Sequence, residues 1–173
     1  MAEGTEAKWQ GKATAELKRS TGEQIWPLLE EFCNLDKFFP SVDTCYRVEG
    51  NPGQPGLVRH CKGPGGWCNE KLLTIDSTNF CLSYEALENN VGLKNYVATL
   101  KVLPVLEGHE DGKPGAAAGC KIELSFVSDP VQLQGMKLEG FVSYIDDCVQ
   151  FMAKKLEDAA AVKLKDSTVD GQI

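Results

Sequence analysis

Residues 9–18 alternate between two kinds of position, with apolar or small side chains on one face and polar side chains on the other. The first face holds five residues: Trp9, Gly11, Ala13, Ala15 and Leu17. A period of two is typical of a half-buried β-strand. We therefore expect a strand here, with this face against the core.

Helix signals follow directly. Ser20 with Glu23, and Thr21 with Gln24, form two overlapping capping boxes of the kind that open a helix. The next apolar residues recur at helical spacing: Ile25, Leu28, Leu29 and Phe32. Pro27 lies early in this segment, so the sequence predicts a kink or a later helix start.

From Val42 the pattern changes to short apolar runs separated by turn residues. Six candidate strands cover residues 42–49, 57–62, 67–75, 80–87, 94–105 and 119–128. Clusters of Pro, Gly, Asn and Asp lie between them, as expected for turns. Between the last two strands, Glu107 to Gly119 is expected to form a surface loop, and we assign no function to His109 within it.

The last predicted element is a long helix over about residues 132–162. Its apolar residues recur at three- and four-residue steps: Leu138, Phe141, Val142, Ile145, Val149, Met152 and Leu156. Such a stripe faces a core. The polar segment 163–173 is expected to be a disordered tail, which leaves one domain over residues 8–162.

The order of elements predicts the fold. Consecutive strands joined by short turns form an antiparallel meander, and one long amphipathic helix must bury its stripe against that sheet. We therefore expect an α+β protein in which one curved antiparallel sheet wraps around the C-terminal helix and encloses an internal cavity.

Composition and charge exclude several classes of protein. With 25 acidic and 18 basic residues the net charge is -7, which disfavours nucleic-acid or anionic-membrane partners. No apolar run approaches the roughly 18 residues of a membrane span. The first ten residues lack the apolar core of a secretory signal. We expect a cytoplasmic protein, and its oligomeric state stays open.

The segment VRHCKGPGGWCNEKL, residues 58–72, predicts a β-hairpin that turns at Pro64-Gly65. This register places Arg59 directly opposite Glu70 and Cys61 opposite Cys68. A shift by one residue would place Arg59 opposite Lys71, which is a repulsive pair. The first register is therefore favoured.

The two charges share their strand faces with apolar residues. Leu57, Leu72 and the two cysteines lie on the same face as Arg59 and Glu70, whereas the other face carries His, Asn and Lys side chains. We therefore expect the pair to point inward rather than to form a solvated salt bridge. Tyr84 and Tyr96 also lie on the more apolar faces of their strands. A few convergent polar groups in an apolar cavity are typical of a small-molecule site.

Motifs for other chemistry are not present in the sequence. It contains no P-loop, no dinucleotide-binding glycine motif, no nucleophile elbow and no zinc-protease motif. We therefore expect no cofactor and no metal, and a small apolar molecule as the partner.

Several segments carry a resemblance to a known family. They are KWQGK (8–12), FCNLDKFFPSVDTCYRVEG (32–50), GLVRHCKG (56–63), WCNEKL (67–72), LSYEAL (82–87) and NYVAT (95–99). The chain resembles the lachrymatory factor synthase family of plants, within the birch-pollen-allergen-like, START-like and polyketide-cyclase-like superfamily. The resemblance runs from about Trp9 to the C-terminal helix.

The resemblance implies a helix-grip fold and a reaction without any cofactor, in which a sulfenic acid rearranges to a thial S-oxide by proton transfer. It also implies an arginine and a glutamate on the cavity wall, matching Arg59 and Glu70, and two cavity tyrosines, matching Tyr84 and Tyr96. The chain departs from the family at Gly63–Gly66, which replaces a longer entrance segment. It also departs at Leu124, where an aromatic residue is expected.

Two hypotheses from different classes follow. The first is a cofactor-free isomerase or cyclase, in which Glu70 is the general acid–base residue and Arg59 holds a developing anion. Its ligand would be apolar or sulfur-containing. The second is a non-catalytic carrier or receptor for an apolar plant metabolite. Abscisic acid receptors belong to the same superfamily, but their gate and latch motifs are replaced here by Gly63–Gly66 and Gly92-Leu93-Lys94.

The cysteines give the first testable prediction. The chain has seven, an odd number, with no zinc-type spacing, so we expect reduced thiols. Although Cys61 faces Cys68 in the predicted register, we expect no disulfide between them. Counting free thiols in denaturant without reductant should give all seven. A count lower by two would contradict this expectation.

Overall fold

The computed structural model describes residues 7–106 and 117–170. Its elements, in chain order, are β1 (Trp9–Leu17), α1 (Gly22–Glu30), the 3-10 helix η1 (Phe32–Lys37), β2 (Thr44–Glu49), β3 (Val58–Gly63), β4 (Gly66–Asp76), β5 (Cys81–Asn89), β6 (Val97–Leu106), β7 (Ala117–Ser128) and α2 (Leu138–Asp170). The predicted order of strand, helices, six strands and long helix is confirmed.

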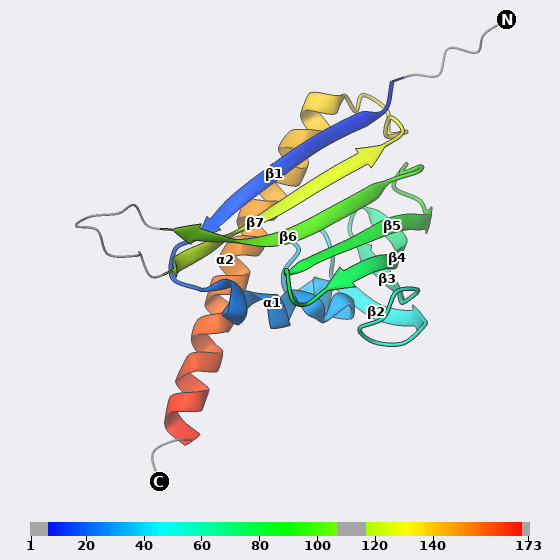
Figure 1. Cartoon of the computed structure of the whole chain (residues 1–173). Helices are drawn as coiled ribbons and strands as arrows, with labels where there is room; N and C mark the ends of the chain where they lie inside the picture. The colour runs from blue at the N-terminus through cyan, green and yellow to red at the C-terminus, as the bar shows by residue number, and fades with distance from the viewer. Residues whose placement is uncertain (1–6, 107–116, 171–173) are drawn as a thin grey trace, which may run out of the picture.

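One curved antiparallel sheet contains the seven strands in the order β1-β7-β6-β5-β4-β3-β2. Consecutive strands from β2 to β7 are neighbours, so the predicted meander is present. Strand β1 joins it at the far edge by pairing with β7. Figure 1 shows α2 lying across one face of this sheet, with α1 and η1 near its lower end. This is the predicted helix-grip arrangement.

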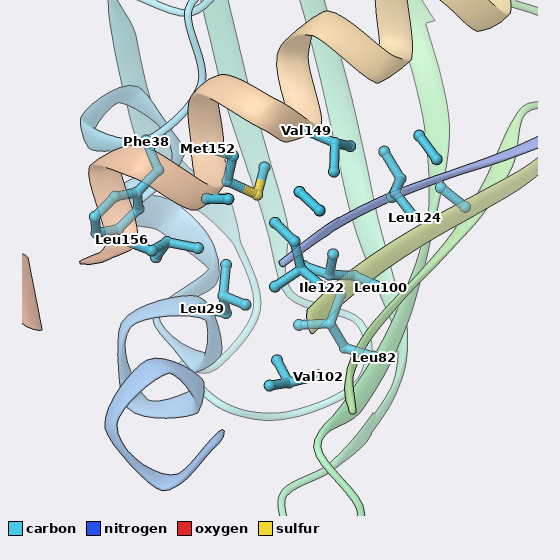
Figure 2. Packing of buried hydrophobic residues seen from close by; sticks show 14 of the residues in the cluster. Leu29, Phe38, Leu82, Leu100, Val102, Ile122, Leu124, Val149, Met152 and Leu156 are labelled. Atoms are coloured by element: carbon cyan, nitrogen blue, oxygen red, sulfur yellow. The ribbon is translucent and has the colours of Figure 1, made fainter. Parts of the chain in front are cut away.

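The core lies between α2 and the sheet. Figure 2 shows Val149, Met152 and Leu156 of α2 directed toward side chains of β5, β6 and β7. Leu82, Leu100 and Ile122 are among those sheet residues and are buried. Each side chain of this size stabilises the fold by about 1.5–3 kcal/mol when it leaves water. The apolar stripe predicted from the sequence is therefore the face that holds α2 on the sheet.

Small residues on the inner face of β1 let α2 approach the sheet there. A Cβ atom at Gly11 would lie 2.9 Å from Val142 of α2 and 2.9 Å from Phe126 of β7. Ala13 and Ala15, on the same face, are buried under the helix. The helix therefore packs closely against the β1 side, and the space between sheet and helix lies toward β3, β4 and β5.

Helix α1 begins at Gly22, and Thr21 caps it. The Thr21 side chain accepts from the Gln24 backbone while the Gln24 side chain accepts from the Thr21 backbone, so the second predicted capping box is present. The alternative of a start after Pro27 is wrong, because the proline lies inside the helix. Phe32, predicted on this helix, is instead the first residue of η1 and is buried.

Both ends of α2 differ from the prediction. The helix starts at Leu138 rather than at 132. Gly135 has a φ of 79°, which is incompatible with a right-handed helix running through this position. It continues to Asp170, so residues 163–170 are helical and the expected disordered tail is wrong for them. Ala, Lys and Leu dominate residues 159–165 and favour helix. Residues 171–173 and the loop at 107–116 with His109 lie outside the described residues.

The chain packs closely against the end of the β3–β4 hairpin at Gly63, where no side chain would fit. A Cβ atom at Gly63 would lie 1.8 Å from the carbonyl oxygen of Ser41, in the segment before β2. The backbone N–H of Asp43 donates to the carbonyl of Lys62 beside it, at 2.8 Å. Gly63 thus allows the segment around Ser41 to cross the hairpin end.

We predict that Gly63→Ala destabilises the protein by about 1–3 kcal/mol, because a backbone carbonyl must move to make room for the methyl group. The measurement is urea unfolding followed by circular dichroism. Gly65→Ala is the matched control in the same turn, since no atom lies within 4 Å of a Cβ at that position. Equal unfolding midpoints for the two variants would contradict the packing described for Ser41.

Candidate functional site

The β3–β4 hairpin has the register predicted from the sequence. Arg59 pairs with Glu70 and Cys61 with Cys68, and Gly63 pairs with Gly66 across the two-residue turn Pro64-Gly65. Both charged residues are buried, with 4% of Arg59 and 9% of Glu70 exposed. The prediction that the pair points inward is therefore confirmed.

Two irregularities of β4 flank Glu70. The register with β5 shifts between Cys68 and Glu70 and again between Leu72 and Thr74. A bulge bends a strand and redirects its side chains, and bulges are frequent next to functional sites. The second shift moves the inner face from Leu72 to Ile75, which packs against the core. Glu70 and Leu72 therefore lie in a short segment with its own register to β5.

Arg59 binds one oxygen of Glu70 with two nitrogens. Its Nε donates to Oε1 at 2.8 Å, and its Nη2 lies 2.8 Å from the same oxygen. Its Nη1 donates to the backbone carbonyl of Phe32 at 2.8 Å. All three guanidinium nitrogens thus have protein acceptors. Among the described residues, no hydrogen bond to Oε2 of Glu70 is formed, so this oxygen is free for another donor.

The guanidinium is also enclosed by aromatic rings. Its central carbon lies 3.8 Å from the ring centroid of Phe32 and 4.9 Å from that of Tyr84. Burial is the largest single influence on the pKa of Arg59 and lowers it, but Glu70 together with Cys61, Tyr84 and Cys45 outweighs burial, so the pKa is raised. Arg59 therefore stays a cation that is fixed by stacking, one carbonyl and one carboxylate.

A cavity of about 520 Å³ lies beside the pair, within the range of small-molecule sites. Its lining is mostly apolar and comes from the hairpin β3–β4, β5, β7, the first turns of α2 and the connecting segments. The lining residues with polar or aromatic side chains are Phe39, Ser41, Lys62, Trp67, Glu70, Tyr84, Tyr96, Phe141 and Tyr144.

The two charges of the pair differ in their access to this cavity. Glu70 lines it, whereas Arg59 lines a smaller adjoining space of about 30 Å³ near η1. Phe32 of η1 provides a ring and a carbonyl that hold the guanidinium behind the carboxylate. The structure thus brings the expected arginine next to the cavity, behind Glu70, and its role toward a ligand stays a prediction.

Tyr84 and Tyr96 both line the cavity, as predicted, and they lie next to each other with ring centroids 6.5 Å apart. Burial raises the pKa of Tyr84, and Glu70 raises it further. Burial, Tyr84 and Glu70 raise the pKa of Tyr96 well above its usual value. Both phenols are therefore protonated at neutral pH and can donate a hydrogen bond.

Exposed lining residues mark the open side of the cavity. Pro64 and Gly65 of the hairpin turn, Leu133 before α2 and Tyr144 of α2 are exposed to solvent there. Tyr144 donates a hydrogen bond to Ser41, which ties α2 to the segment before β2. The entrance is thus formed by the β3–β4 turn together with the segment before α2 and α2 itself.

Three contributors to the site were not predicted. Phe32 belongs to a 3-10 helix of six residues, too short to produce a periodic signal. Trp67, which pairs with Lys62 across the hairpin, stacks on His60 and also lines the cavity. Tyr144 adjoins Phe141 and Ile145 of the helix stripe, and its position at the edge of that stripe was the available signal.

Residues 7–106 and 117–170 contain no group of three His, Cys, Asp or Glu side chains that could hold a metal ion. Within the same ranges, no helix is long and apolar enough to cross a membrane. All seven cysteines are free thiols. The cavity therefore offers hydrogen-bonding and carboxylate groups rather than a metal-ligand set.

Comparisons with known proteins agree with this geometry. Two solved bacterial structures are similar: XoxI from Bacillus cereus, with a TM-score of 0.66 and 22% identity over 88% of this chain and 96% of that one, and a putative uncharacterized protein from Bacillus thuringiensis, with a TM-score of 0.64 and 21% identity over 88% and 98%. At this identity the likeness shows the fold. The model of the family "Polyketide cyclase / dehydrase and lipid transport" matches residues 8–161. The chain therefore belongs to the polyketide cyclase / dehydrase and lipid transport family.

Proposed function

We propose that the protein binds a neutral, largely apolar small molecule in the cavity and that Glu70 transfers a proton on it. One observation supports this most strongly: a buried carboxylate, held through Oε1 by Arg59, lines an apolar cavity with Oε2 unbonded among the described residues. A carboxylate fixed in this way is preorganised to accept a proton from a ligand and to return it.

The charges of the cavity favour a neutral ligand. Glu70 and Lys62 are the two charged residues of the described lining, and Lys62 is exposed. The inner end therefore presents a negative oxygen, while the nitrogens of Arg59 are occupied by protein acceptors. A ligand carboxylate placed there would face like charge in a low dielectric. A hydroxyl or similar donor would instead find an acceptor.

The reaction that fits the resemblance is the rearrangement of an alkenyl sulfenic acid to a thial S-oxide. Its O–H bond breaks, a C–H bond forms on the alkene, and the double bond moves from C=C to C=S. Atoms and electrons balance without a co-reactant, since the reaction is an isomerisation. A related isomerisation or cyclisation of another apolar substrate would use the same carboxylate.

Each predicted site residue has a role in this proposal. Glu70 is the acid–base residue, and the cavity phenols of Tyr84 and Tyr96 position the substrate or relay the proton. Arg59 holds the Glu70 carboxylate in place through Oε1, and so acts through the carboxylate rather than on the substrate. Breaking such a buried pair costs about 3–5 kcal/mol because it leaves one charge unpaired.

A carrier of an apolar metabolite is the second candidate. The mostly apolar lining and a family description that includes lipid transport favour it. In that case Glu70 and the two tyrosines would orient a ligand hydroxyl without any proton transfer. The two candidates differ in turnover and agree in ligand binding.

We predict that Glu70→Gln lowers turnover of a sulfenic acid generated in the assay by about 100-fold or more, the usual contribution of a general acid–base group. Binding of an apolar alcohol should change far less, because the amide oxygen still accepts a hydrogen bond. The assay compares product formation with binding measured by calorimetry. Glu85→Gln on the neighbouring strand β5 is the matched control, since Glu85 is absent from the cavity lining.

Arg59→Leu should lose turnover as well and should also unfold at lower urea concentration. Full activity in a folded Glu70→Gln variant would refute the assignment of Glu70. If the wild-type protein binds the alcohol and turns over no sulfenic acid or related substrate, the carrier replaces the enzyme.

A further inference from the structure

A pair of thiols lies next to the Arg59–Glu70 pair, one on Arg59's own strand β3 and one on the neighbouring strand β2. Cys45 of β2 pairs directly with Cys61 of β3, and their sulfur atoms are 3.7 Å apart. Cys61 also lies opposite Cys68 across β3–β4, the pair for which the sequence analysis expects no disulfide. Its sulfur instead contacts Cys45, while the thiol of Cys68 donates to the carbonyl of Asn69.

The surroundings of Cys45 favour its thiolate. The Cys61 sulfur lies within hydrogen-bonding distance of the Cys45 sulfur, the backbone of Leu35 in η1 adds a second hydrogen bond, and the Arg59 cation lies nearby. The Cys61 hydrogen bond is the largest cause and, although burial acts against it, lowers the pKa of Cys45 to about 7. The Asp36 carboxylate of η1 opposes this lowering of the Cys45 pKa. The nearby thiol of Cys33, also in η1, has its own pKa raised by burial and by Cys45.

Access and placement also differ between the two sulfurs. Cys45 is partly exposed on β2, which is the edge strand of the sheet. Cys61 is buried, lines the large cavity, and its sulfur lies 3.7 Å from Oε1 of Glu70. An attacking thiolate within reach of small solutes therefore adjoins a second thiol that contacts the proposed catalytic carboxylate. Reactive cysteines have such partly exposed, electropositive surroundings.

We propose that Cys45 and Cys61 form a redox-active dithiol, oxidised by a peroxide to an intramolecular disulfide between β2 and β3. The Cys45 thiolate attacks one peroxide oxygen, forms a sulfenic acid and releases hydroxide. The Cys61 sulfur then attacks the Cys45 sulfur, an S–S bond forms, and the lost proton and hydroxyl leave as water. Two thiols are oxidised by two electrons, and one hydrogen peroxide is reduced to two waters.

The oxidation would act on the site through Cys61. A disulfide requires the sulfur atoms to approach to about 2.05 Å. The Cys61 sulfur must therefore move toward Cys45 and away from Glu70. Oε1 of Glu70, the oxygen bound by Arg59, then loses its contact with the Cys61 sulfur. Cys45 and Cys61 are thus expected to be two of the seven thiols without oxidant and to form the disulfide with peroxide.

The test uses the whole chain with hydrogen peroxide, followed by alkylation, trypsin digestion and mass spectrometry. Trypsin separates the three relevant thiols, because Cys45 lies in residues 38–47, Cys61 in 60–62 and Cys68 in 63–71. We expect a linked peptide that joins 38–47 to 60–62. It should persist in the matched control Cys68→Ala and disappear in Cys61→Ala, where Cys45 should be trapped as sulfenic acid by dimedone.

A second measurement tests the preorganised thiolate without any oxidation. The rate of Cys45 alkylation by iodoacetamide should rise with pH through a midpoint of about 7, because the reactive thiolate is present above its pKa. Cys61→Ala should move this midpoint upward, since the hydrogen bond between Cys61 and Cys45 is lost. Three results would overturn the proposal. They are a disulfide between Cys61 and Cys68, oxidation of Cys33 or Cys81 before Cys45, and an alkylation midpoint that is the same in Cys61→Ala as in the wild type.

Discussion

The buried ion pair of Arg59 and Glu70 is the interaction on which the arrangement of the site depends. Removing two charges from water costs several kcal/mol for each ion, and good geometry must offset this cost. Here two guanidinium nitrogens share one carboxylate oxygen, and a third is bound to the carbonyl of Phe32. Leucine at both positions would give stability more simply. The pair is therefore better explained by what Oε2 of Glu70, which accepts no hydrogen bond within the described part of the chain, can do in the cavity.

The same interaction determines how neighbouring elements are placed. Phe32 must stack on the guanidinium, so η1 lies over β3, and the register shifts of β4 keep Glu70 in its own short segment toward the cavity. At the opposite edge of the sheet, in β1, Gly11 and its small neighbours let α2 pack closely. The cavity lies toward β3–β5, where aromatic side chains and Glu70 line the space between sheet and helix and α2 does not pack as closely.

Much of this was predictable from local patterns. Alternation gave the strands, and one charge-repulsion argument gave the register that places Arg59 opposite Glu70. The access of each charge to the cavity was not predictable, because it depends on Phe32, which is 27 residues from Arg59 in a helix without periodicity. That Cys61 contacts Cys45 rather than Cys68 was likewise not predictable, because both lie opposite it on neighbouring strands and the side-chain rotamer determines which sulfur it meets. The C-terminal helix extended beyond its apolar stripe because helix propensity does not require burial.

The central claim is that Oε2 of Glu70 receives a hydrogen bond from a neutral ligand in the cavity. A crystal structure with a medium-chain aliphatic alcohol tests it most directly, since the alcohol has an apolar body and one hydroxyl. The account predicts that the hydroxyl oxygen lies about 2.7 Å from Oε2, with the chain along the apolar lining. A hydroxyl directed to the open side near Tyr144, or bound to Arg59 in place of Glu70, would contradict it.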